Sequence, residues 1–312
     1  MRVLIALGGN AMTAPDGRAR PDDQIAALAV AARRIAEVVA GGHQVAVTHG
    51  NGPQVGNLLV KNEIAASVVP PVPLDWCGAQ TQGTIGFVLL DALQHSLAEL
   101  HAERPVGAVV TRTLVDADDP AFAHPTKPIG RYLPADEAKV MIEHGQSWED
   151  RGRQGWRRVV ASPEPHEILD APAIGALLSA GFVVVGAGGG GVPVVRDGDG
   201  ALRGVEAVID KDLAASVLGR ELGADVLVIA TDVDHVALDF GKPHERPLRR
   251  VSVAELRRHA RDGHFGSGSM GPKVEAACRF VEAGGRRTVI TSLEHIERAL
   301  TGASGTVVEP NE

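Results

Sequence analysis

Short apolar runs and amphipathic stretches alternate along the chain. The run "RVLIAL" at 2–7 is apolar from Val3 to Leu7 and leads into glycines, which is typical of a strand buried on both faces. The following stretch, 22–42, repeats apolar residues at helical spacing and ends in Gly41-Gly42, a signal for a helix C-terminus. This alternation predicts a mostly parallel sheet with helices on both of its faces.

The same signals define the other expected elements. We expect strands over 2–7, 43–52, 106–115, 182–188, 204–210, 224–234 and 286–292. We expect helices over 22–42, 79–100, 171–181, 210–223, 252–263, 271–285 and 293–302, with Asp210 as the N-cap of the fourth. The chain has no internal repeat, and a boundary near 204–211 would divide it into two α/β lobes.

The alternation breaks between about 116 and 165. This segment is rich in Pro and Asp and has no clean period. It carries four of the ten aromatic residues of the chain, namely Phe122, Tyr132, Trp148 and Trp156. Long inserts of this kind often cover active sites, so we expect a small lid subdomain with an aromatic core of its own.

The composition excludes several classes of protein. Hydrophobic residues make up 44% of the chain but aromatic residues only 3%, so the core must consist of Val, Leu, Ile and Ala. The net charge of −8 argues against a nucleic-acid partner. Cys77 and Cys278 stand far apart, as expected for reduced thiols. Because no apolar run approaches the roughly 18 residues of a membrane helix, we expect a soluble, cytoplasmic protein without a membrane partner.

A glycine-rich stretch, "FVVVGAGGGGVPVV" at 182–195, contains the spacing G-x-G-x-x-G of dinucleotide-binding loops. Such a loop must open a helix, whose N-terminus then faces the pyrophosphate. Here Pro193 and β-branched valines follow, which indicates a strand or an extended loop. We therefore reject an NAD-dependent oxidoreductase. Two alternatives stay open: a glycine bulge or turn, and a loop where the backbone approaches a ligand.

Other catalytic motifs are missing from the sequence. It contains no P-loop, no protein-kinase signature and no G-x-S-x-G elbow. The twelve histidines show no H-E-x-x-H or other metal-ligand spacing, so we expect no metal site formed by the protein. His49, in "THGNG", is the one histidine in a glycine turn, and we favour a local hydrogen-bonding role over a catalytic one.

Glycine turns follow three of the expected strands, at 8–11, 49–52 and 186–191. In a parallel sheet the carboxyl ends of strands meet at one edge, where ligands bind. The exposed N–H groups of such turns suit phosphate oxygens. Phosphoryl transfer also needs cations, and candidate lysines stand in similar Gly, Pro and Asp contexts, namely Lys127, Lys211 and Lys273.

These glycine turns and lysines belong to longer sequence blocks in which the chain resembles carbamate kinases of the amino acid kinase superfamily. The matching blocks cover nearly its full length, in the family order. They are "ALGGNAM" (6–12), "THGNGPQVGNLL" (48–59), "PLDWCGAQTQGTIGF" (73–87), "VDADDPAFAHPTKPIGRY" (115–132), "GWRRVVASPEPHEI" (155–168), "GGGGVPVV" (188–195), "VEAVIDKDLAA" (205–215), "ATDVD" (230–234) and "GSMGPKVEAACRFVE" (268–282).

The resemblance implies a three-layer α/β/α sandwich around one mostly parallel, open sheet. Residues 1–208 would form a carbamate-binding lobe that includes the protruding lid, and 209–312 a nucleotide-binding lobe. The implied reaction is reversible: ATP and carbamate give ADP and carbamoyl phosphate. The family often runs it toward ATP in arginine breakdown, and dimerises through the N-terminal lobe. ATP or ADP would bind with Mg²⁺.

The resemblance also implies roles for individual residues. Backbone N–H groups would contact the transferred phosphoryl group and help to fix the carbamate; these residues are Gly8, Gly9, Asn10, Gly50 and Asn51. Lys211 and Lys273 would neutralise the phosphates, and Asp212 would hold both lysines in place. Lys127 would close over the site from the lid. Asp232 and Met270 would join Lys273 in the nucleotide pocket.

The glycine loop acquires a specific expectation from this family. Its glycines would form a wall close to the carbamate and the phosphoryl group. An added Cβ at Gly189 or Gly190 would then reduce activity more than stability. One departure concerns the adenine side, because the family pattern has a tyrosine near Ala237 or Leu238 and this chain has none.

Two rival hypotheses remain beside this one. Another kinase of the superfamily would act on acetylglutamate, aspartate or a nucleoside monophosphate, but such relatives lack "PTKPIG" and the aromatic insert. A non-catalytic homologue would bind nucleotide or carbamoyl phosphate without turnover, and the intact lysines argue against it.

Overall fold

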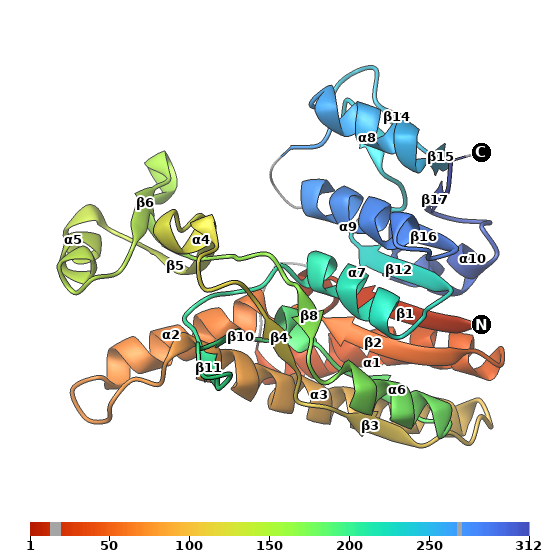
Figure 1. The fold of residues 1–312 in the computed structure, drawn as a ribbon, viewed down its shortest axis with the longest axis horizontal. Coiled ribbons are helices and arrows are strands. Elements are labelled where there is room, and N and C mark those ends of the chain that lie inside the picture. The colour runs from red at the N-terminus through yellow and green to blue at the C-terminus, as the bar shows by residue number, and fades with distance from the viewer. Residues whose placement is uncertain (13–19, 267–269, 312) are drawn as a thin grey trace.

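An eight-stranded sheet forms the centre of the molecule (Figure 1). The computed structural model describes residues 1–12, 20–266 and 270–311, with Asn10 and Ala11 described by their backbone alone. The strand order is β15-β17-β16-β12-β1-β2-β9-β3. The strands are β1 (Arg2–Leu7), β2 (Gln44–His49), β3 (Val106–Ala108), β9 (Val183–Val185), β12 (Val226–Thr231), β15 (Arg250–Ser252), β16 (Arg287–Ser292) and β17 (Thr306–Glu309).

The sheet is mostly parallel. Its strands from β16 to β3 all run in one direction, whereas β17 pairs with β16 in the antiparallel sense and β15 runs with β17. Strand β1 lies at the centre, between β2 and β12. The two expected lobes therefore share one continuous sheet.

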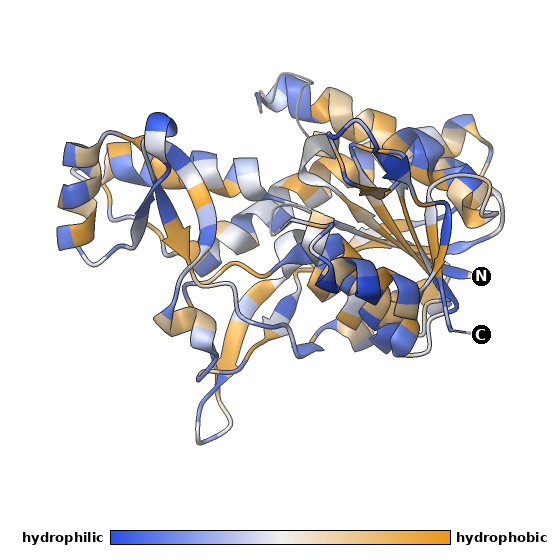
Figure 2. Ribbon diagram, turned by 90° about the horizontal axis from the view of Figure 1, so that it is seen from above, coloured by the Kyte–Doolittle hydropathy of each residue, from blue (hydrophilic) through white to orange (hydrophobic). Residues whose placement is uncertain are grey.

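Helices cover both faces of this sheet. Successive side chains of β1 point to opposite faces, so they belong alternately to two hydrophobic clusters. Leu4 and Ala6 belong to one hydrophobic cluster, whereas Val3, Ile5 and Leu7 belong to the other. Figure 2 shows hydrophobic residues along the central strands. The first cluster includes residues of α6 (Ala171–Ser179), α7 (Lys211–Glu221), α8 (Val253–Arg261) and α9 (Met270–Glu282); the second includes residues of α1 (Pro21–Ala40), α3 (Leu74–Glu99) and α10 (Ile296–Leu300). The predicted three-layer α/β/α class is confirmed.

Local sequence signals account for the ends of the main helices. Helix α1 begins with Pro21, has acidic residues in its first turn, and ends at Gly41 and Gly42, the latter with a φ of 83°. Helix α7 begins after Asp210, whose carboxylate accepts hydrogen bonds from the amides of Asp212 and Leu213. Asp210 is thus the N-cap that the sequence predicted.

A protruding subdomain extends from one end of the sheet (Figure 1). It consists of residues 120–160 and contains a three-stranded sheet in the order β5-β7-β6. Its elements are α4 (Pro120–Ala123), β5 (Lys127–Leu133), α5 (Ala135–Glu143), β6 (Trp148–Asp150) and β7 (Trp156–Val160). This arrangement gives the Pro-rich insert a sheet of its own.

The core of the subdomain is less aromatic than expected. Trp148 and Trp156 do pack together with Leu133 and Ala138. Tyr132, however, is 38% exposed and lies under the guanidinium group of Arg157. Phe122 packs against the core of the main body instead. The prediction that all four aromatic residues fill one small core is therefore wrong for these last two.

Two expected strands differ in the structure. The run 106–115 is split: β3 belongs to the central sheet, but β4 (Arg112–Leu114) joins a second sheet, β11-β10-β4-β8. In that sheet β10 spans Val192–Arg196, β11 Leu202–Gly204 and β8 Glu167–Ile168. The expected strand 204–210 is wrong, because β11 ends at Gly204 and beyond it only Ala207 forms an isolated bridge, to Ala161.

Several elements were not predicted. Helix α2 (Gly52–Ala65) begins inside a glycine turn, where Gly52, Pro53 and Gly56 obscure the helical period. Strand β17 and the hairpin of β13 (Ala237–Leu238) and β14 (Arg246–Pro247) are too short to give a periodic signal. Within the described part of the chain, no helix has both the length and the apolar composition needed to cross a membrane.

Candidate active site

The carboxyl ends of the central parallel strands place the glycine turns next to one another. The amide of Gly8 donates to the carbonyl oxygen of Ala230 over 2.9 Å, and the amide of Gly50 donates to that of Leu7 over 3.1 Å. A Cβ on Gly50 would lie 3.3 Å from the amide nitrogen of Gly9. The turns after β1 and β2 therefore form one backbone surface, and Asn10 follows in the same short 3₁₀ helix, Gly9–Met12.

Three charged side chains meet at the N-terminus of α7. Asp212 is only 3% exposed. Its Oδ1 accepts a hydrogen bond from Lys211 Nζ, and its Oδ2 accepts one from Lys273 Nζ over 3.2 Å. Lys273 comes from the first turn of α9 and is also buried. The structure thus brings together the three residues that were expected to interact.

The charges in this cluster balance one another only in part. Burial alone would raise the pKa of Asp212, but the ammonium groups of Lys211 and Lys273 lower it below its ordinary value. The carboxylate is therefore ionised at neutral pH, and the cluster of one anion and two cations carries a net positive charge. Both cations lie at helix N-termini, whose dipoles also favour an anionic ligand.

Lys127 reaches the same helix end from the protruding subdomain. Its Nζ donates to Oδ2 of Asp210 over 2.9 Å. The other carboxylate oxygen of Asp210 caps α7, so both oxygens have partners. The sequence analysis singled out Lys127 and Asp210 separately. The two residues are 83 positions apart, so no local pattern could predict that they pair and connect the protruding subdomain to the main body.

The glycine loop that follows β9 is buried and clamped by side chains. Thr48 Oγ1 donates to the carbonyl oxygen of Ala187, and Thr113 Oγ1 donates to that of Gly190, both over 2.7 Å. Gln82 Nε2 donates to the carbonyl oxygen of Gly188 over 3.1 Å. The loop is followed by strand β10 and not by a long helix, which agrees with the rejection of a dinucleotide-binding loop in the sequence analysis. Sequence reasoning missed these polar side chains, because each contacts a backbone far away in the chain.

The geometry revises what the loop glycines do. Gly189, Gly190 and Gly191 all have positive φ angles, between 69° and 91°. A Cβ on Gly189 would lie 2.1 Å from Asn51 Nδ2, and one on Gly190 would lie 2.9 Å from both Cβ and O of Ile209. These directions are occupied by the protein itself. The expectation that an added Cβ at either position reduces activity more than stability stays a prediction, but these overlaps indicate that the packing of the fold also needs both glycines.

Replacing Gly190 with alanine should lower the free energy of unfolding by about 1–3 kcal/mol from backbone strain alone, and further through the overlap with Ile209. Gly200→Ala is the matched control, because Gly200 has a similar φ of 88° but nothing within 4 Å of the added Cβ. Urea unfolding of both variants measures the difference. Equal midpoints would contradict a packing role for Gly190.

Asn51 links the glycine turn, helix α2 and the glycine loop. Its carbonyl oxygen accepts from the amide of Val55, and its Nδ2 donates to Thr81 Oγ1 over 2.9 Å. Gly189 packs against the same side-chain amide. Asn51 is thus held at the strand ends through its backbone carbonyl and, on its side chain, by Thr81 and Gly189.

His49 has the structural role that the sequence favoured. It is fully buried, and its Nδ1 lies 2.7 Å from the carbonyl oxygen of Gly50, to which it donates when protonated there. Burial, with a smaller contribution from the charge of Lys211, lowers the pKa of His49 to about 4. The ring is therefore neutral at pH 7 and packs against Gly188.

The residues expected to contact the nucleotide come from the C-terminal part of the chain. Asp232 follows β12 and is exposed, and Thr231 Oγ1 donates to its Oδ1 over 2.9 Å. Met270 begins α9, but 268 and 269 of the same sequence block lie outside the described residues. Ala237 and Leu238 form β13 and are buried, whereas Phe240, two positions further on, is 67% exposed.

The comparisons with known proteins agree with this arrangement. The model of the amino acid kinase family matches residues 1–292. The carbamate kinase of Thermococcus kodakarensis is 47% identical over 98% of each chain, and a carbamate kinase-like protein of Escherichia coli is 46% identical over 97% of each. The structure of the Giardia lamblia carbamate kinase bound to AMP-PNP has a TM-score of 0.94 and 40% identity, covering 99% of this chain and 98% of that one.

Proposed function

The chain belongs to the amino acid kinase family, and from that membership and the geometry of the site we propose that it catalyses reversible phosphoryl transfer between ATP and carbamate. The single observation that carries this proposal is the buried Lys211–Asp212–Lys273 cluster, placed beside glycine turns at the carboxyl edge of the sheet. Cations held in place and N–H donors are what a moving phosphoryl group requires.

The chemistry asks for positioning more than for acid–base catalysis. The attacking oxygen of carbamate is already anionic, so it needs no strong general base. We assign the backbone N–H groups of Gly9 and Asn10 to the transferred phosphoryl group. Those of Gly8 and Gly50 already donate to the carbonyl oxygens of Ala230 and Leu7, so these two glycines would act by allowing the backbone to approach the ligand closely, and not as donors. Gly50 and Asn51 would help to fix the carbamate. The glycine loop, including Gly189 and Gly190, would act indirectly, by holding Asn51 and the strand ends in place.

Lys211 and Lys273 would neutralise the phosphate oxygens from the nucleotide side. Asp212 engages both ammonium groups and so fixes their positions. It would act as a positioning residue through the two lysines. Asp232 and Met270 would line the nucleotide pocket, with the base next to the β13–β14 hairpin.

Mg²⁺ would arrive with ATP. The oxygens of Asp212 are taken by two lysines, and those of Asp210 by Lys127 and two backbone amides. Neither carboxylate is therefore well suited to a metal ion. We propose that Mg²⁺ is held mainly by phosphate oxygens and water, as its coordination preferences allow. Asp232, which is exposed and directly follows β12, is the carboxylate that could contribute a further oxygen ligand.

A coupled assay tests the proposed reaction. The protein is incubated with ADP, Mg²⁺ and carbamoyl phosphate, and ATP is measured with luciferase. We expect ATP to form well above an enzyme-free control. An absence of ATP above that background would overturn the proposal and favour a non-catalytic homologue. ADP release from ATP with acetylglutamate, aspartate or nucleoside monophosphates tests the other kinases of the superfamily.

Replacing Lys127 with methionine should lower the turnover rate by roughly 100-fold, the lower range for losing one positioned donor. We propose that Lys127 leaves Asp210 and contacts the phosphoryl group during the reaction. Stability should change little, since partly exposed ion pairs contribute about 0–1 kcal/mol. Steady-state kinetics and urea unfolding measure both effects.

A second ion pair between lid and body supplies the control. Arg131 Nη2 lies 3.4 Å from Glu63 Oε2 of α2. Arg131→Met removes this contact but leaves the cation at 127. Turnover of Arg131→Met should stay near the original value. An equal loss in the two variants would indicate general docking of the lid and not a specific role for Lys127.

We further propose that the protein makes ATP during arginine catabolism in the cytoplasm. Two free, buried cysteines, Cys77 and Cys278, are consistent with a reducing compartment. The ratio of kcat/KM in the two directions, measured at cellular concentrations of the substrates, tests the direction of flux.

A homodimer through the N-terminal lobe is the last part of the proposal. A groove of about 410 Å³ between α1, α2 and α3 is lined by both polar and apolar side chains. Two of the apolar ones, Ile25 and Phe87, are 51% and 61% exposed. Exposed apolar patches of this kind mark interfaces. Phe87→Glu should convert a dimer to a monomer in light scattering, whereas Val140→Glu on α5 should not.

A further inference from the structure

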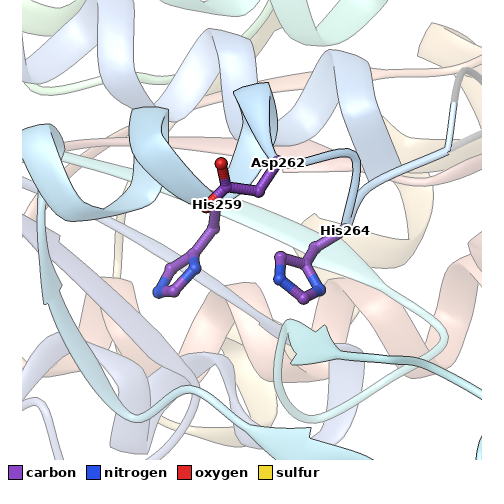
Figure 3. A group of neighbouring side chains, drawn as sticks. All are labelled: His259, Asp262 and His264. Atoms are coloured by element: carbon purple, nitrogen blue, oxygen red, sulfur yellow. The ribbon is translucent and has the colours of Figure 1, made fainter.

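A second cluster of polar side chains lies at the C-terminal end of α8, apart from the lysine cluster. It consists of His259, Asp262 and His264 (Figure 3). One ligand atom from each residue lies within 4.8 Å of the others. The two imidazole rings are next to each other, with centroids 5.5 Å apart and planes at 80°. Among the described residues, this is the one group whose atoms are arranged to share a metal ion.

The helix end itself brings the two histidines together. Gly263 has a φ of 79°, its amide donates to the carbonyl oxygen of Ala260, and the amide of His264 donates to that of His259. These are the two hydrogen bonds of a Schellman motif, which places the side chains of its first and last residues in contact. That contact is usually hydrophobic, but here both positions carry an imidazole.

The ring of His259 lacks the partners that a buried polar group needs. His259 is 9% exposed, and neither of its ring nitrogens has a hydrogen-bond partner within the described structure. The nearest carboxylate oxygen, Glu255 Oε1, lies 3.6 Å from Nε2, which is too far for a hydrogen bond. Buried polar atoms without a partner are rare in native proteins and often mark a missing ion or water.

We propose that His259, Asp262 and His264 bind a divalent transition-metal ion, with Zn²⁺ the best fit. Imidazole nitrogens and one carboxylate are common ligands of zinc, and a fourth position would be left for water or another side chain. Mg²⁺ is a poor fit, because it prefers oxygen ligands.

Neighbouring groups supply the charge that a divalent cation requires. Asp239 Oδ1 lies 3.8 Å from His264 Nδ1, and Glu255 approaches His259 from the preceding turn of α8. Lys242 and His244 also contact Asp239 and partly offset its charge. With Asp262, three carboxylates thus surround the two imidazoles, and Asp239 is placed to complete the ligand set or to orient His264.

The ion would join two segments that are distant in sequence. Asp239 lies in the β13–β14 hairpin, whereas the three proposed ligands end α8. A bound ion would therefore fix the end of α8 against the hairpin, as a structural site. The spacing His-x₂-Asp-x-His is not among the motifs considered in the sequence, and the proposal departs here from the expectation that the protein forms no metal site.

A competition titration tests the site. The full-length protein is stripped with a chelator, freed of it, and titrated with Zn²⁺ against a chromophoric chelator. We expect one tight site per chain, and with Co²⁺ the intense visible bands of tetrahedral coordination. His264→Gln and Asp262→Asn should each weaken Zn²⁺ binding at least tenfold and remove the rise in melting temperature that Zn²⁺ gives the original protein.

A matched histidine elsewhere provides the control. His95 Nε2 lies 3.2 Å from Glu99 Oε1 on the exposed face of α3, which makes them an ordinary pair of surface residues. His95→Gln should leave the tight site unchanged. The proposal is overturned if the original protein binds Zn²⁺ no more tightly than Asp262→Asn, whose exposed position should not disturb folding, or if only His95→Gln weakens binding.

Discussion

Replacing Lys273 with methionine should lower the rate of ATP formation from ADP and carbamoyl phosphate by roughly 100- to 1000-fold, the usual effect of removing one positioned electrostatic donor. The reason is that Lys273 is buried, held by Asp212, and stands in the first turn of α9, where helix dipole and ammonium act on the same anion. Methionine keeps the apolar stem, so the loss reports on the charge.

The stability of this variant should fall much less than its activity. Asp212 keeps its bond to Lys211, so no carboxylate is left buried without a partner. Lys139→Met, at an exposed position on α5, serves as the control for removing any lysine. Steady-state kinetics with luciferase detection measure the rates. Full activity in Lys273→Met would contradict the role given to this residue.

Asp212→Asn should lower the free energy of unfolding by about 3–5 kcal/mol, the range for removing one partner of a buried ion cluster. The amide keeps the shape of the carboxylate, but two ammonium groups then share a buried site without an anion. Both also lose their fixed positions, so activity should fall as well. Urea unfolding measures the first effect, and the luciferase assay the second.

The pH dependence of the Asp212 contribution follows from the direction of its shift. Its pKa is lower in the folded than in the unfolded protein. The unfolded chain therefore binds the proton more readily, and the contribution is fully present above the ordinary pKa of about 3.9. It is lost as the pH falls through the lowered folded value. The stability difference between the original protein and Asp212→Asn should therefore shrink in acid.

Asp91→Asn, which removes an exposed carboxylate from α3, is the control for this series. Its midpoint of urea unfolding should stay close to that of the original protein at every pH. An Asp212→Asn variant that unfolds at the same urea concentration as the original protein near pH 7 would show that the cluster adds nothing to stability.

The elements that sequence predicted well are those with long, uniform signals. Strand 2–7 is apolar at every position after Arg2, and the helix expected at 22–42 begins at Pro21, one residue earlier than predicted. Both are decided by local composition, by proline at a helix start and by glycine at its end. Lys211 and Lys273 stood out by their local sequence, but their link through Asp212 came from the family resemblance, because nothing local connects Asp212 with Lys273, 61 positions away.

The errors occurred where tertiary contacts override a continuous pattern. The run 106–115 has the composition of one strand, yet it forms two strands in different sheets, because β3 pairs with β9 and β4 pairs with β10. The polar side chains around the glycine loop gave no signal, since Thr48, Gln82 and Thr113 are ordinary residues for a strand or helix. Their function depends on backbone carbonyls from a distant segment.

The histidine cluster illustrates the same limit. His259 and His264 are close in sequence, but only the turn at Gly263 brings their rings together. A search of the sequence for established metal-binding spacings does not find this pair of histidines, whereas the structure of the helix end shows that their side chains lie together.

The central position of β1 has a consequence for how the chain is made. This strand is synthesised before the other strands of the sheet, and its local partner β2 follows soon after. Its other neighbour comes much later, because Val3 pairs with Val226. Closing so long a loop is entropically slow. The edge of β1 that faces β12 must therefore stay unpaired during most of translation, when nascent chains are most exposed to aggregation and to chaperones.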